Sequence, residues 1–527
     1  MKSLTLCLLG LFLLTHCANQ KQVQVTSPSV RTNEVRGVWI TNIDSDVMFS
    51  KQATAKAIDY LADNGFNVVF PVVWNDGYTL FPSKTMETYF GSAFKIDTLF
   101  RKQGRDPLDE LIVEAHRRGL EVIPWFEFGF SSSINQKGGH MLKKYPHWSA
   151  LDAKGGMLTK NGFEWMNAFD PEVQQFVTEL VMEVPKQYDV DGVQGDDRLP
   201  SLPAEGGYEP KTRQAYEAAT GRPVPELYSD SLFMRWKADQ LSAYGKQLYQ
   251  TVKAFDPSLM VSYSPIIYPW GYDHYLQDWP AWVKGGFVDL LIPQSYRYDI
   301  QQYKATTDEI VKYARQAGVD NTTLAIGILT KSGPRYNGPS YVKQALAHNR
   351  AVGSAGEVFF FYEGMNQNNA YLADSLHASY YAQPATLPYR KGSVRRKPAA
   401  IVDESKATYT GNWAPKTTEE AFNGSYQEGI GSVKYTFVSE EAARYEVFIH
   451  IPYGLNLTEA PKTAITFGNH TDGFFRNDTI STKLEGWVRI GEVTTAVQDW
   501  VYVQLSSALI FPADGVMFLK KLNKPQN

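Results

Sequence analysis

Eight short apolar runs, each followed by a segment with helical periodicity, constrain the fold of this chain more than any other feature. Continuous apolar runs of this kind are typical of parallel strands that helices cover, and repeated strand–helix units indicate an α/β domain. Eight repeats in about 350 residues predict a (β/α)₈ TIM barrel with some long loops. The runs are residues 35–40, 67–73, 121–126, 190–193, 260–264, 288–292, 323–328 and 357–361.

Capping residues support the helices expected between these runs. Ser50 and the Asp-Pro pairs at 106–107 and 170–171 are typical of helix starts, and Gly65 and Gly119 stand where helices commonly end. A doubly wound open sheet is the alternative α/β arrangement. It lacks its usual support here, because no Gly-rich phosphate loop follows the first apolar run.

Residues 1–17 are expected to be an export signal. Their apolar run, residues 4–14, follows a single lysine and is too short to span a bilayer. The sequence around Cys17 looks like a bacterial lipobox and predicts lipidation of that cysteine, with ordinary secretion and cleavage nearby as the alternative. Residues 18–33 are polar and suit a flexible tether. We therefore expect the protein in the bacterial cell envelope, held to a membrane only by its N-terminal lipid.

Composition excludes several classes of protein. Cys7 and Cys17 are the two cysteines, so no disulfide is expected in the mature chain, and the 527 residues must fold around a large apolar core. The net charge of −4, without a long basic run, argues against nucleic acid as a partner. Neither metal-ligand spacing nor a Gly-x-Ser-x-Gly elbow is present. We expect a monomer that needs no metal and no cofactor.

The amino-acid composition of the chain changes at residues 384–398. This segment holds three prolines and five basic residues, and its composition predicts a linker that acts as a solvated hinge. Beyond it, short stretches of alternating residues such as 445–451 and 500–505 replace the helical period. We therefore expect a barrel over residues 34–383 and an all-β sandwich over residues 399–527.

Carboxylates gather where the predicted strands end, and a barrel's active site lies at those ends. Residues 190–198 show this most clearly, because an apolar run stops at Asp196 and Asp197. Glu127 and Glu363 follow two other runs. Each has a structural alternative: paired aspartates cap helices or hold turns, Glu127 can form an ion pair with an arginine, and Glu363 can hold a loop.

These four carboxylates suit the hydrolysis of a glycosidic bond. That reaction needs one carboxyl group to protonate the leaving oxygen and a second to act as nucleophile or to activate water. Glu127 lies between two phenylalanines, which predicts a raised pKa and the role of acid. Asp196 or Asp197 would then stay ionised beside Arg198. The separation that decides between retaining and inverting chemistry does not follow from the sequence.

Substrate contacts are expected from aromatic and polar side chains at the same strand ends. Flat aromatic rings can stack on sugars, although a buried tryptophan is more often a core residue. The residues predicted to bind substrate are Trp39, Asn42, Trp74, Asn75, Trp125, Arg198, Gln294 and Tyr296.

Four motifs in order resemble the bacterial glycosyl hydrolase-like 10 family. They are EVRGVW at 34–39, GFNVV at 65–69, the segment 167–173 and VDGVQGDD at 190–197. The resemblance covers about residues 31–383 and implies a (β/α)₈ barrel that hydrolyses glycosides. The family includes lipoproteins proposed to cleave peptidoglycan glycan strands, and its motif carries over only to Asp196 and Asp197. Gly195 stands where a bulkier residue is expected, which would open the pocket.

The C-terminal part resembles a golvesin-type β-sandwich. The motifs are found at residues 401–404, 409–413, 486–491 and 513–516, in the order of that domain. The resemblance implies a role in binding glycan or cell-wall material.

Two functional hypotheses follow. The first is an exported glycoside hydrolase that acts on a bacterial polysaccharide, with peptidoglycan glycan strands as one candidate substrate. The second is a glycan-binding surface lipoprotein without hydrolytic activity. The carboxylates at the strand ends favour the enzyme, because binding alone does not require acids that are costly to desolvate. A purely structural role would leave all of them paired with arginines.

Overall fold

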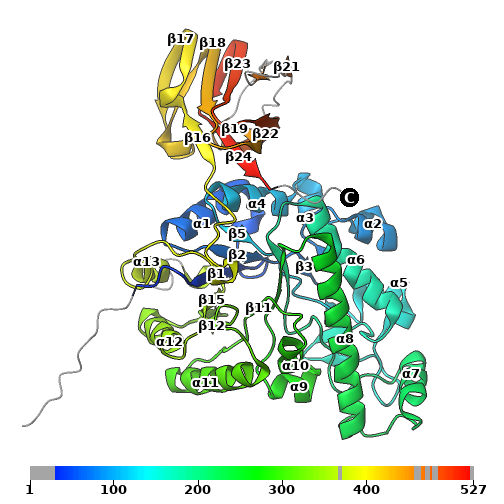
Figure 1. Cartoon of the computed structure of the whole chain (residues 1–527). Coiled ribbons are helices and arrows are strands. Elements are labelled where there is room, and N and C mark those ends of the chain that lie inside the picture. Colours follow the sequence, from blue (N-terminus) through cyan, green and yellow to red (C-terminus); the bar gives the residue numbers. More distant parts are fainter. Residues whose placement is uncertain (1–29, 366–370, 456–464, 469–474, 477–484, 523–527) are drawn as a thin grey trace, which may run out of the picture.

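The computed structural model describes residues 30–365, 371–455, 465–468, 475–476 and 485–522. The predicted signal, Cys17 and most of the predicted tether lie outside these residues. Figure 1 shows a large region of strands and helices, with a smaller region of strands stacked on one end of it. No helix in the described part of the chain is long and apolar enough to cross a membrane.

Eight parallel strands form the centre of the large region, one within or overlapping each predicted run. Five pair in the order β12-β15-β1-β2-β5 and three in the order β11-β10-β9. Parallel bridges join Trp125 to Gln194 between the β5 and β9 sides, and Leu291 to Leu324 between the β11 and β12 sides. The edge strands of the first sheet, β5 and β12, are therefore each bridged to an edge of the second sheet, whereas an open doubly wound sheet would leave two free edges. The strands are β1 (Val35–Ile40), β2 (Val68–Pro71), β5 (Glu121–Val122), β9 (Gly192–Gly195), β10 (Met260–Tyr263), β11 (Leu290–Leu291), β12 (Ala325–Leu329) and β15 (Gly356–Phe360).

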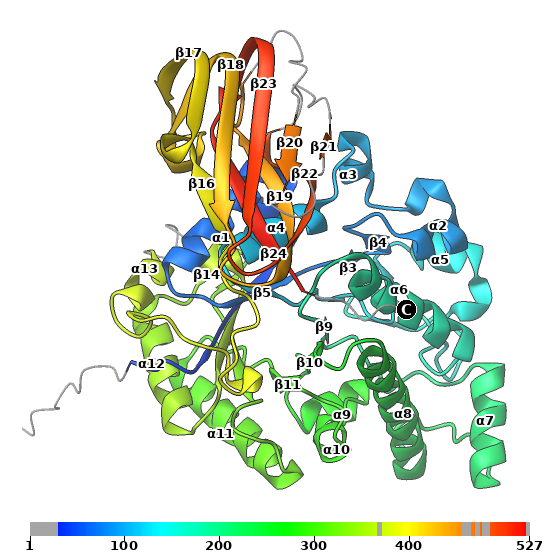
Figure 2. The same cartoon turned by 45° about the horizontal axis from the view of Figure 1, so that its top comes forward.

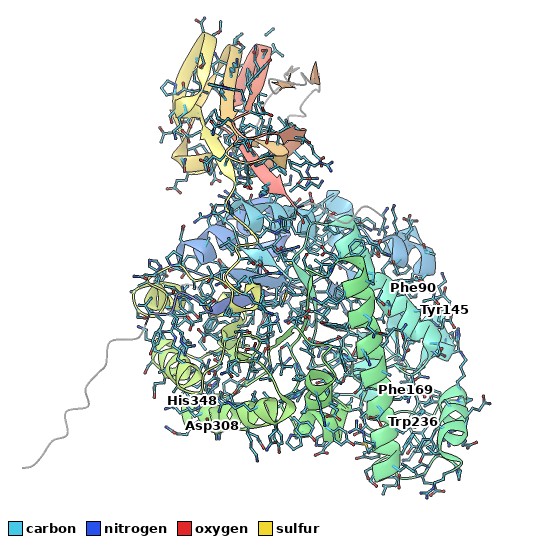
Figure 3. All side chains as sticks on the ribbon, viewed as in Figure 1. Phe90, Tyr145, Phe169, Trp236, Asp308 and His348 are labelled. Carbon is cyan, nitrogen blue, oxygen red and sulfur yellow. The ribbon has the colours of Figure 1, made fainter. Side chains whose placement is uncertain are left out.

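Helices surround these strands (Figure 2). The predicted cap at Ser50 is confirmed, because its hydroxyl accepts a hydrogen bond from the Ala53 amide, and Asp106 and Asp170 cap their helices in the same way. Neighbouring helices also contact each other through side chains, as where Asp308 lies 2.8 Å from His348 (Figure 3). The main helices are α1 (Lys51–Asp63), α4 (Pro107–Arg117), α6 (Pro171–Gln187), α8 (Ser231–Phe255), α10 (Trp279–Lys284), α11 (Ile300–Ala317), α12 (Pro339–Ala351) and α13 (Leu372–His377).

Shorter elements lie in the long loops. After β5, the strands β6, β7 and β8 form a small antiparallel sheet, and after β10 the chain forms the short helix α9. These insertions follow the carboxyl ends of the parallel strands, so they build the surroundings of those ends. The short elements are β3 (Trp74–Asn75), β4 (Tyr78–Thr79), α2 (Lys84–Phe90), α3 (Thr98–Gln103), β6 (Ser131–Ile134), α5 (Gly139–Lys144), β7 (Thr159–Lys160), β8 (Phe163–Trp165), α7 (Pro210–Thr220), α9 (Trp270–Tyr275), β13 (Lys331–Ser332) and β14 (Arg335–Tyr336).

The C-terminal region consists of two antiparallel sheets that share one core. Val447 and Phe518 of the first sheet and Val433 and Val503 of the second belong to a single buried cluster. Phe437 stacks on Phe518 with ring centroids 4.5 Å apart, which ties the sheets together. The first sheet is β16 (Ala400–Asp403), β24 (Gly515–Lys521), β19 (Ala443–Ile451) and β22 (Gly486–Thr495); the second is β17 (Thr408–Thr417), β18 (Ser425–Val438), β23 (Trp500–Ala513), β20 (Ile465–Gly468) and β21 (Phe475–Arg476).

Three of the five basic side chains in the segment between the two regions, Arg390, Arg395 and Arg396, pair with carboxylates of the large region, so the interpretation as a wholly solvated hinge is wrong; Lys391 and Lys397 are exposed. Arg390 Nη2 lies 2.7 Å from a carboxylate oxygen of Glu121, the first residue of β5. Arg396 pairs with Asp191, just before β9, also at 2.7 Å, and its side chain is 3% exposed. Carboxylates buried beneath the strands require cationic partners, and the segment supplies them.

The C-terminal region packs along α4 of the large region. Arg489 lies 3.3 Å from Asp109 in the first turn of α4, and the Ala399 amide donates to the Arg117 carbonyl in its last turn at 3.0 Å. Val113 of α4 contacts a cluster formed with Phe448, Met517 and Leu519. In Figure 1 this region lies above α4, whereas α9 lies at the opposite end. The C-terminal region therefore lies on the α4 side of the large region, across from α9.

Candidate active site

Asp196 is the most enclosed of the predicted site carboxylates. It directly follows β9 and is 1% exposed. Its Oδ2 accepts a hydrogen bond from Trp125 Nε1 at 2.8 Å, and its Oδ1 accepts one from the Arg198 amide at 2.9 Å. Burial raises the pKa of Asp196 well above its usual range, the charge of Asp197 adds to this, and the Arg198 guanidinium opposes it. The site therefore favours the protonated form of Asp196.

One guanidinium holds three carboxyl groups together. Arg198 lies 3.2 Å from Glu127, 3.3 Å from Asp197 and 3.8 Å from Asp196. Its Nε also donates to the Glu127 carbonyl at 2.8 Å. With all three groups ionised, three negative charges would face one positive charge. Like charges this close favour a proton on at least one carboxyl group, so the cluster retains acid–base capacity.

Glu127 combines partial burial with fixed orientation. Its side chain is 19% exposed, and its Oε2 accepts a hydrogen bond from Asn75 Nδ2. Burial raises the pKa of Glu127, while Arg198 and Asn75 oppose the rise. The direction agrees with the prediction for a general acid. Asn75, predicted to contact substrate, instead contacts this carboxylate.

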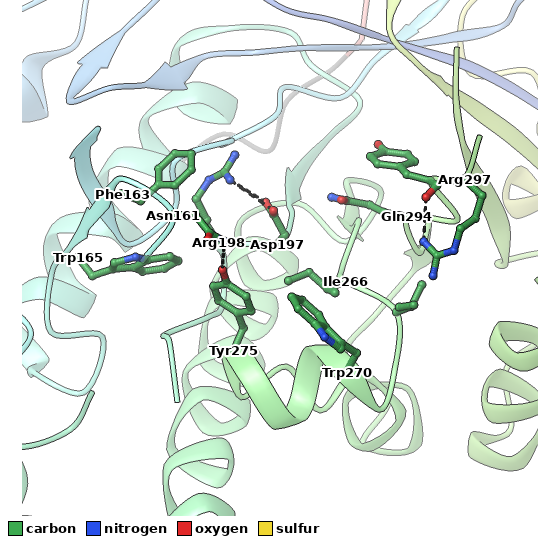
Figure 4. Close-up of a pocket in the computed structure, with 12 residues that line it drawn as sticks. Asn161, Phe163, Trp165, Asp197, Arg198, Ile266, Trp270, Tyr275, Gln294 and Arg297 are labelled. Atoms are coloured by element: carbon green, nitrogen blue, oxygen red, sulfur yellow. Dashed lines mark hydrogen bonds and ion pairs between the residues drawn. The ribbon is translucent and has the colours of Figure 1, made fainter. Parts of the chain in front are cut away.

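A cavity of about 410 Å³ opens beside Asp197 and Arg198 (Figure 4). Its volume lies in the range of small-ligand sites. The Asp197 side chain is 27% exposed, in contrast to the enclosed Asp196. The lining residues come from β7–β8, from the loops after β9, β10 and β11, and from α9: Asn161, Phe163, Trp165, Asp197, Arg198, Ile266, Ile267, Trp270, Tyr275, Gln294, Tyr296 and Arg297.

Four aromatic residues of this cavity were not found from the sequence: Phe163, Trp165, Trp270 and Tyr275. Trp270 is 46% exposed and offers a ring face to a ligand. Trp165 is 1% exposed, and its Nε1 has no hydrogen-bond partner within the described residues. A buried donor without a partner beside a cavity is available to a ligand oxygen.

The three predicted tryptophan platforms are core residues, so this prediction is wrong. Trp39 and Trp74 are each 1% exposed, and their Nε1 atoms donate to Gln194 Oε1 and to the Gly129 carbonyl. Trp125 is 3% exposed and donates to Asp196. A ring can stack on a sugar only through an accessible face. Trp125 therefore orients a carboxyl group.

The structure separates two other predicted residues from the cluster around Arg198. Glu363 accepts a hydrogen bond from Ser45 Oγ at 2.9 Å and does not line the cavity. Asn42 does not line it either, and its Oδ1 is buried without a partner within the described residues. Both follow strands on the far side of the strand set, whereas the cavity lies beside β9, β10 and β11. Gln294, Tyr296 and Arg198 do line the cavity, and their contact with substrate stays a prediction.

Gly195 does not open the pocket, contrary to expectation. A Cβ at this position would lie 2.3 Å from the Leu199 carbonyl oxygen and 3.1 Å from the Tyr263 ring. Close packing therefore excludes a side chain here. In the described part of the chain, no three or more His, Cys, Asp or Glu residues are arranged to hold a metal ion.

Comparisons with known proteins relate the chain to glycosyl hydrolases. A sequence model described as "Glycosyl hydrolase-like 10" matches residues 34–343. Glycosyl hydrolase YngK of Bacillus subtilis (strain 168) is 26% identical over 398 residues, 67% of this chain and 73% of that protein. Glycosyl hydrolase DigH of Escherichia coli (strain K12) is 29% identical over 317 residues, 56% of this chain and 69% of that protein.

A solved structure shares the fold of the large region. The glycoside hydrolase domain of PgaB (BpsB) from Bordetella bronchiseptica superposes with a TM-score of 0.51 at 13% identity, over 65% of this chain and 98% of that domain. At this identity the likeness concerns the fold alone.

Proposed function

The chain belongs to the glycosyl hydrolase-like 10 family, and we propose that it is an exported glycoside hydrolase that cleaves O-glycosidic bonds of a bacterial polysaccharide. One observation carries this proposal. Three carboxyl groups share one arginine at the edge of a cavity that is lined by aromatic rings and hydrogen-bonding side chains. A pair of carboxyl groups beside a sugar-sized cavity is what glycoside hydrolysis requires.

We also propose the fold of each region and the residues at which each begins and ends. We infer that the eight parallel strands form one closed (β/α)₈ barrel over residues 34–383, which the bridges at both margins support. The two antiparallel sheets would form a golvesin-like sandwich over residues 399–527, joined by the packed segment 384–398. The site then lies at the carboxyl ends of the barrel strands, where barrel enzymes place their chemistry.

Glu127 and Asp197 are proposed as the reacting pair because both side chains are accessible. Glu127 would give its proton to the glycosidic oxygen as the bond between that oxygen and the anomeric carbon breaks. Asp197 would either bond to the anomeric carbon or take a proton from the water that attacks it. In the first case, water then cleaves the sugar ester with Glu127 as base. The anomeric configuration of the product distinguishes the two routes.

Asp196 would support this pair without contacting the substrate. It is too enclosed to contact a sugar directly, and burial favours its protonated form. If Asp196 is neutral, the positive charge of Arg198 interacts mainly with Asp197 and Glu127. Trp125 would keep Asp196 in place through its hydrogen bond.

Peptidoglycan glycan strands are the substrate that we propose. The predicted signal at residues 1–17, with lipidation of Cys17, would bring the enzyme to the cell envelope, where this polymer lies. The C-terminal region would bind glycan as well. Because it packs along α4, across the large region from α9 and the cavity, it would hold a part of the polymer away from the bond being cleaved.

One observation favours a non-catalytic glycan-binding lipoprotein instead. Every carboxylate of the cluster touches Arg198, as expected where acids are only held in place. A single cation cannot neutralise three carboxylates, however, so we place the binding protein second.

The test measures fragments released from purified peptidoglycan glycan strands by the wild type, Asp197→Asn and Glu127→Gln. Glu309→Gln, on the exposed face of α11, is the matched control. We expect release by the wild type and the control, and a loss of about a thousandfold or more in either site variant. Sedimentation of each protein with the insoluble glycan measures binding separately. Binding without release by the wild type would establish the non-catalytic function.

A further inference from the structure

A lysine without solvent contact lies next to the segment that follows the carboxylate cluster. Lys237 of α8 is 0% exposed. Its Nζ donates to the carbonyls of Ala204 and Gly206, the second at 3.1 Å, and lies 3.5 Å from the Tyr228 carbonyl. The ammonium also lies 4.2 Å from the centre of the Phe233 ring. The lysine thus bonds to backbone carbonyls rather than pairing with a carboxylate.

The segment bonded to Lys237 also supports a wall of the cavity. The Ala204 amide donates to the His274 carbonyl at 3.0 Å, and Ser201 Oγ donates to the Tyr275 carbonyl at 3.2 Å. Both acceptors belong to α9, which supplies Trp270 and Tyr275 to the cavity. Residues 199–206 therefore run from the cluster around Arg198 to the back of α9.

A second contact reinforces the same connection. Glu205 pairs with Lys160 of β7 at 2.9 Å, and Lys160 also donates to the His274 carbonyl at 3.0 Å. Packing around the lysine is tight, because a Cβ on Gly207 would lie 2.9 Å from Lys237 Cδ. The apolar stem of the lysine fills the space, and its ammonium satisfies carbonyls that would otherwise be buried without donors.

We propose that Lys237 is a positioning residue of the active site, which fixes residues 199–209 so that α9 presents Trp270 and Tyr275 across the cavity from Asp197. Its effect on substrate rests on the proposed function. The fixing of the segment does not, and it can be measured without any ligand.

Proton linkage gives this role a signature that ordinary core packing lacks. Burial lowers the pKa of Lys237 to about 7, and the charges of Glu205 and Glu209 oppose the fall. Opening the segment would expose the lysine and return its pKa towards about 10.4, so opening takes up a proton. Opening should therefore become harder as pH rises above about 7, by up to about tenfold per pH unit.

Hydrogen exchange of the full chain, without ligand, tests this from about pH 6 to about pH 9 after correction for intrinsic exchange rates. Lys237→Met keeps the stem and removes the donors, Lys237→Gln keeps a neutral donor, and Lys246→Met changes an exposed lysine of the same helix. We expect opening of residues 199–209 and 270–275 to rise at least about tenfold in Lys237→Met and less in Lys237→Gln. Neither variant should show the pH slope of the wild type and Lys246→Met.

Two results would overturn the proposal. One is unchanged exchange with an unchanged pH slope in Lys237→Met. The other is loss of protection throughout β1 and β12 as well, which would make Lys237 an ordinary core residue. With glycan substrate, Lys237→Met should raise KM about tenfold and change kcat less than about threefold. If the wild type cleaves no glycan, the proposed function fails, and the exchange data still decide the role of Lys237.

Discussion

Replacing Arg396 by methionine should substantially weaken the attachment of the C-terminal region. Arg396 Nε donates to Asp191 at 2.7 Å, and its Nη1 and Nη2 each donate to the Asp189 carboxylate at 2.9 Å. Asp191 would keep His116 and Arg395, whereas Asp189 would lose its guanidinium. Breaking a buried ion pair typically costs about 3–5 kcal/mol. Because the Asp189 side chain is 18% exposed, we expect the lower end, about 3 kcal/mol.

The pH dependence of this loss follows from the carboxylates. Although burial opposes it, Arg396 lowers the pKa of Asp189 and holds that of Asp191 well below its usual range. Carboxyl groups with a lowered pKa add stability that is present above their unfolded pKa of about 3.9 and is lost as pH falls through the folded value. The difference between the wild type and Arg396→Met should therefore be full at about pH 7 and shrink below about pH 4.

Urea unfolding at both pH values measures the effect, from the first transition of this two-region chain. Lys397→Met is the matched control, because Lys397 is 68% exposed and lies 3.8 Å from Glu441. The control should change the free energy of unfolding by less than about 0.5 kcal/mol. If Arg396→Met behaves like Lys397→Met, the buried segment does not stabilise the junction and the reasoning is refuted.

Three further predictions concern the site. Trp125→Phe removes the 2.8 Å hydrogen bond to Asp196 and should lower kcat by about tenfold to a hundredfold with the fold intact by circular dichroism; an unchanged kcat would contradict the positioning role. Trp270→Ala removes a ring that is 46% exposed and should raise KM about threefold to tenfold at constant kcat and Tm in steady-state and melting assays, whereas a fall in kcat alone would contradict a binding role. Because burial raises the pKa of Glu127, kcat should fall as pH rises through that value, and Glu127→Gln should abolish this limb of the pH–rate profile; a limb that persists would assign the acid elsewhere.

The strands could be predicted because each is nearly or fully buried and lies within or overlaps an apolar run, even where it carries a buried polar residue such as Arg36 or Glu121. The run at 35–40 is buried at every position in β1. The two carboxylates after β9 could also be predicted, because strand and site are adjacent in sequence. Arg198 follows in the same stretch, so the centre of the site needed no long-range contact to be found.

The cavity walls could not be predicted in the same way. Phe163 and Trp165 come from an insertion after β5, and Trp270 from a helix beyond β10; their meeting depends on how two long loops pack. Trp39 failed as a platform because its position at a strand end does not reveal whether its ring faces solvent or core. The burial of Arg396 could not be predicted either, because its buried partners lie more than 200 residues earlier in the sequence.

The most direct test of the proposed hydrolase is a crystal structure of Asp197→Asn with a peptidoglycan glycan fragment long enough to span the cavity. A hydrolase should bind the fragment with a glycosidic oxygen within hydrogen-bond distance of Glu127, the adjacent anomeric carbon beside residue 197, and a sugar ring against Trp270. A fragment bound only to the C-terminal sheets, with the cavity beside Arg198 empty at saturating ligand, would contradict it.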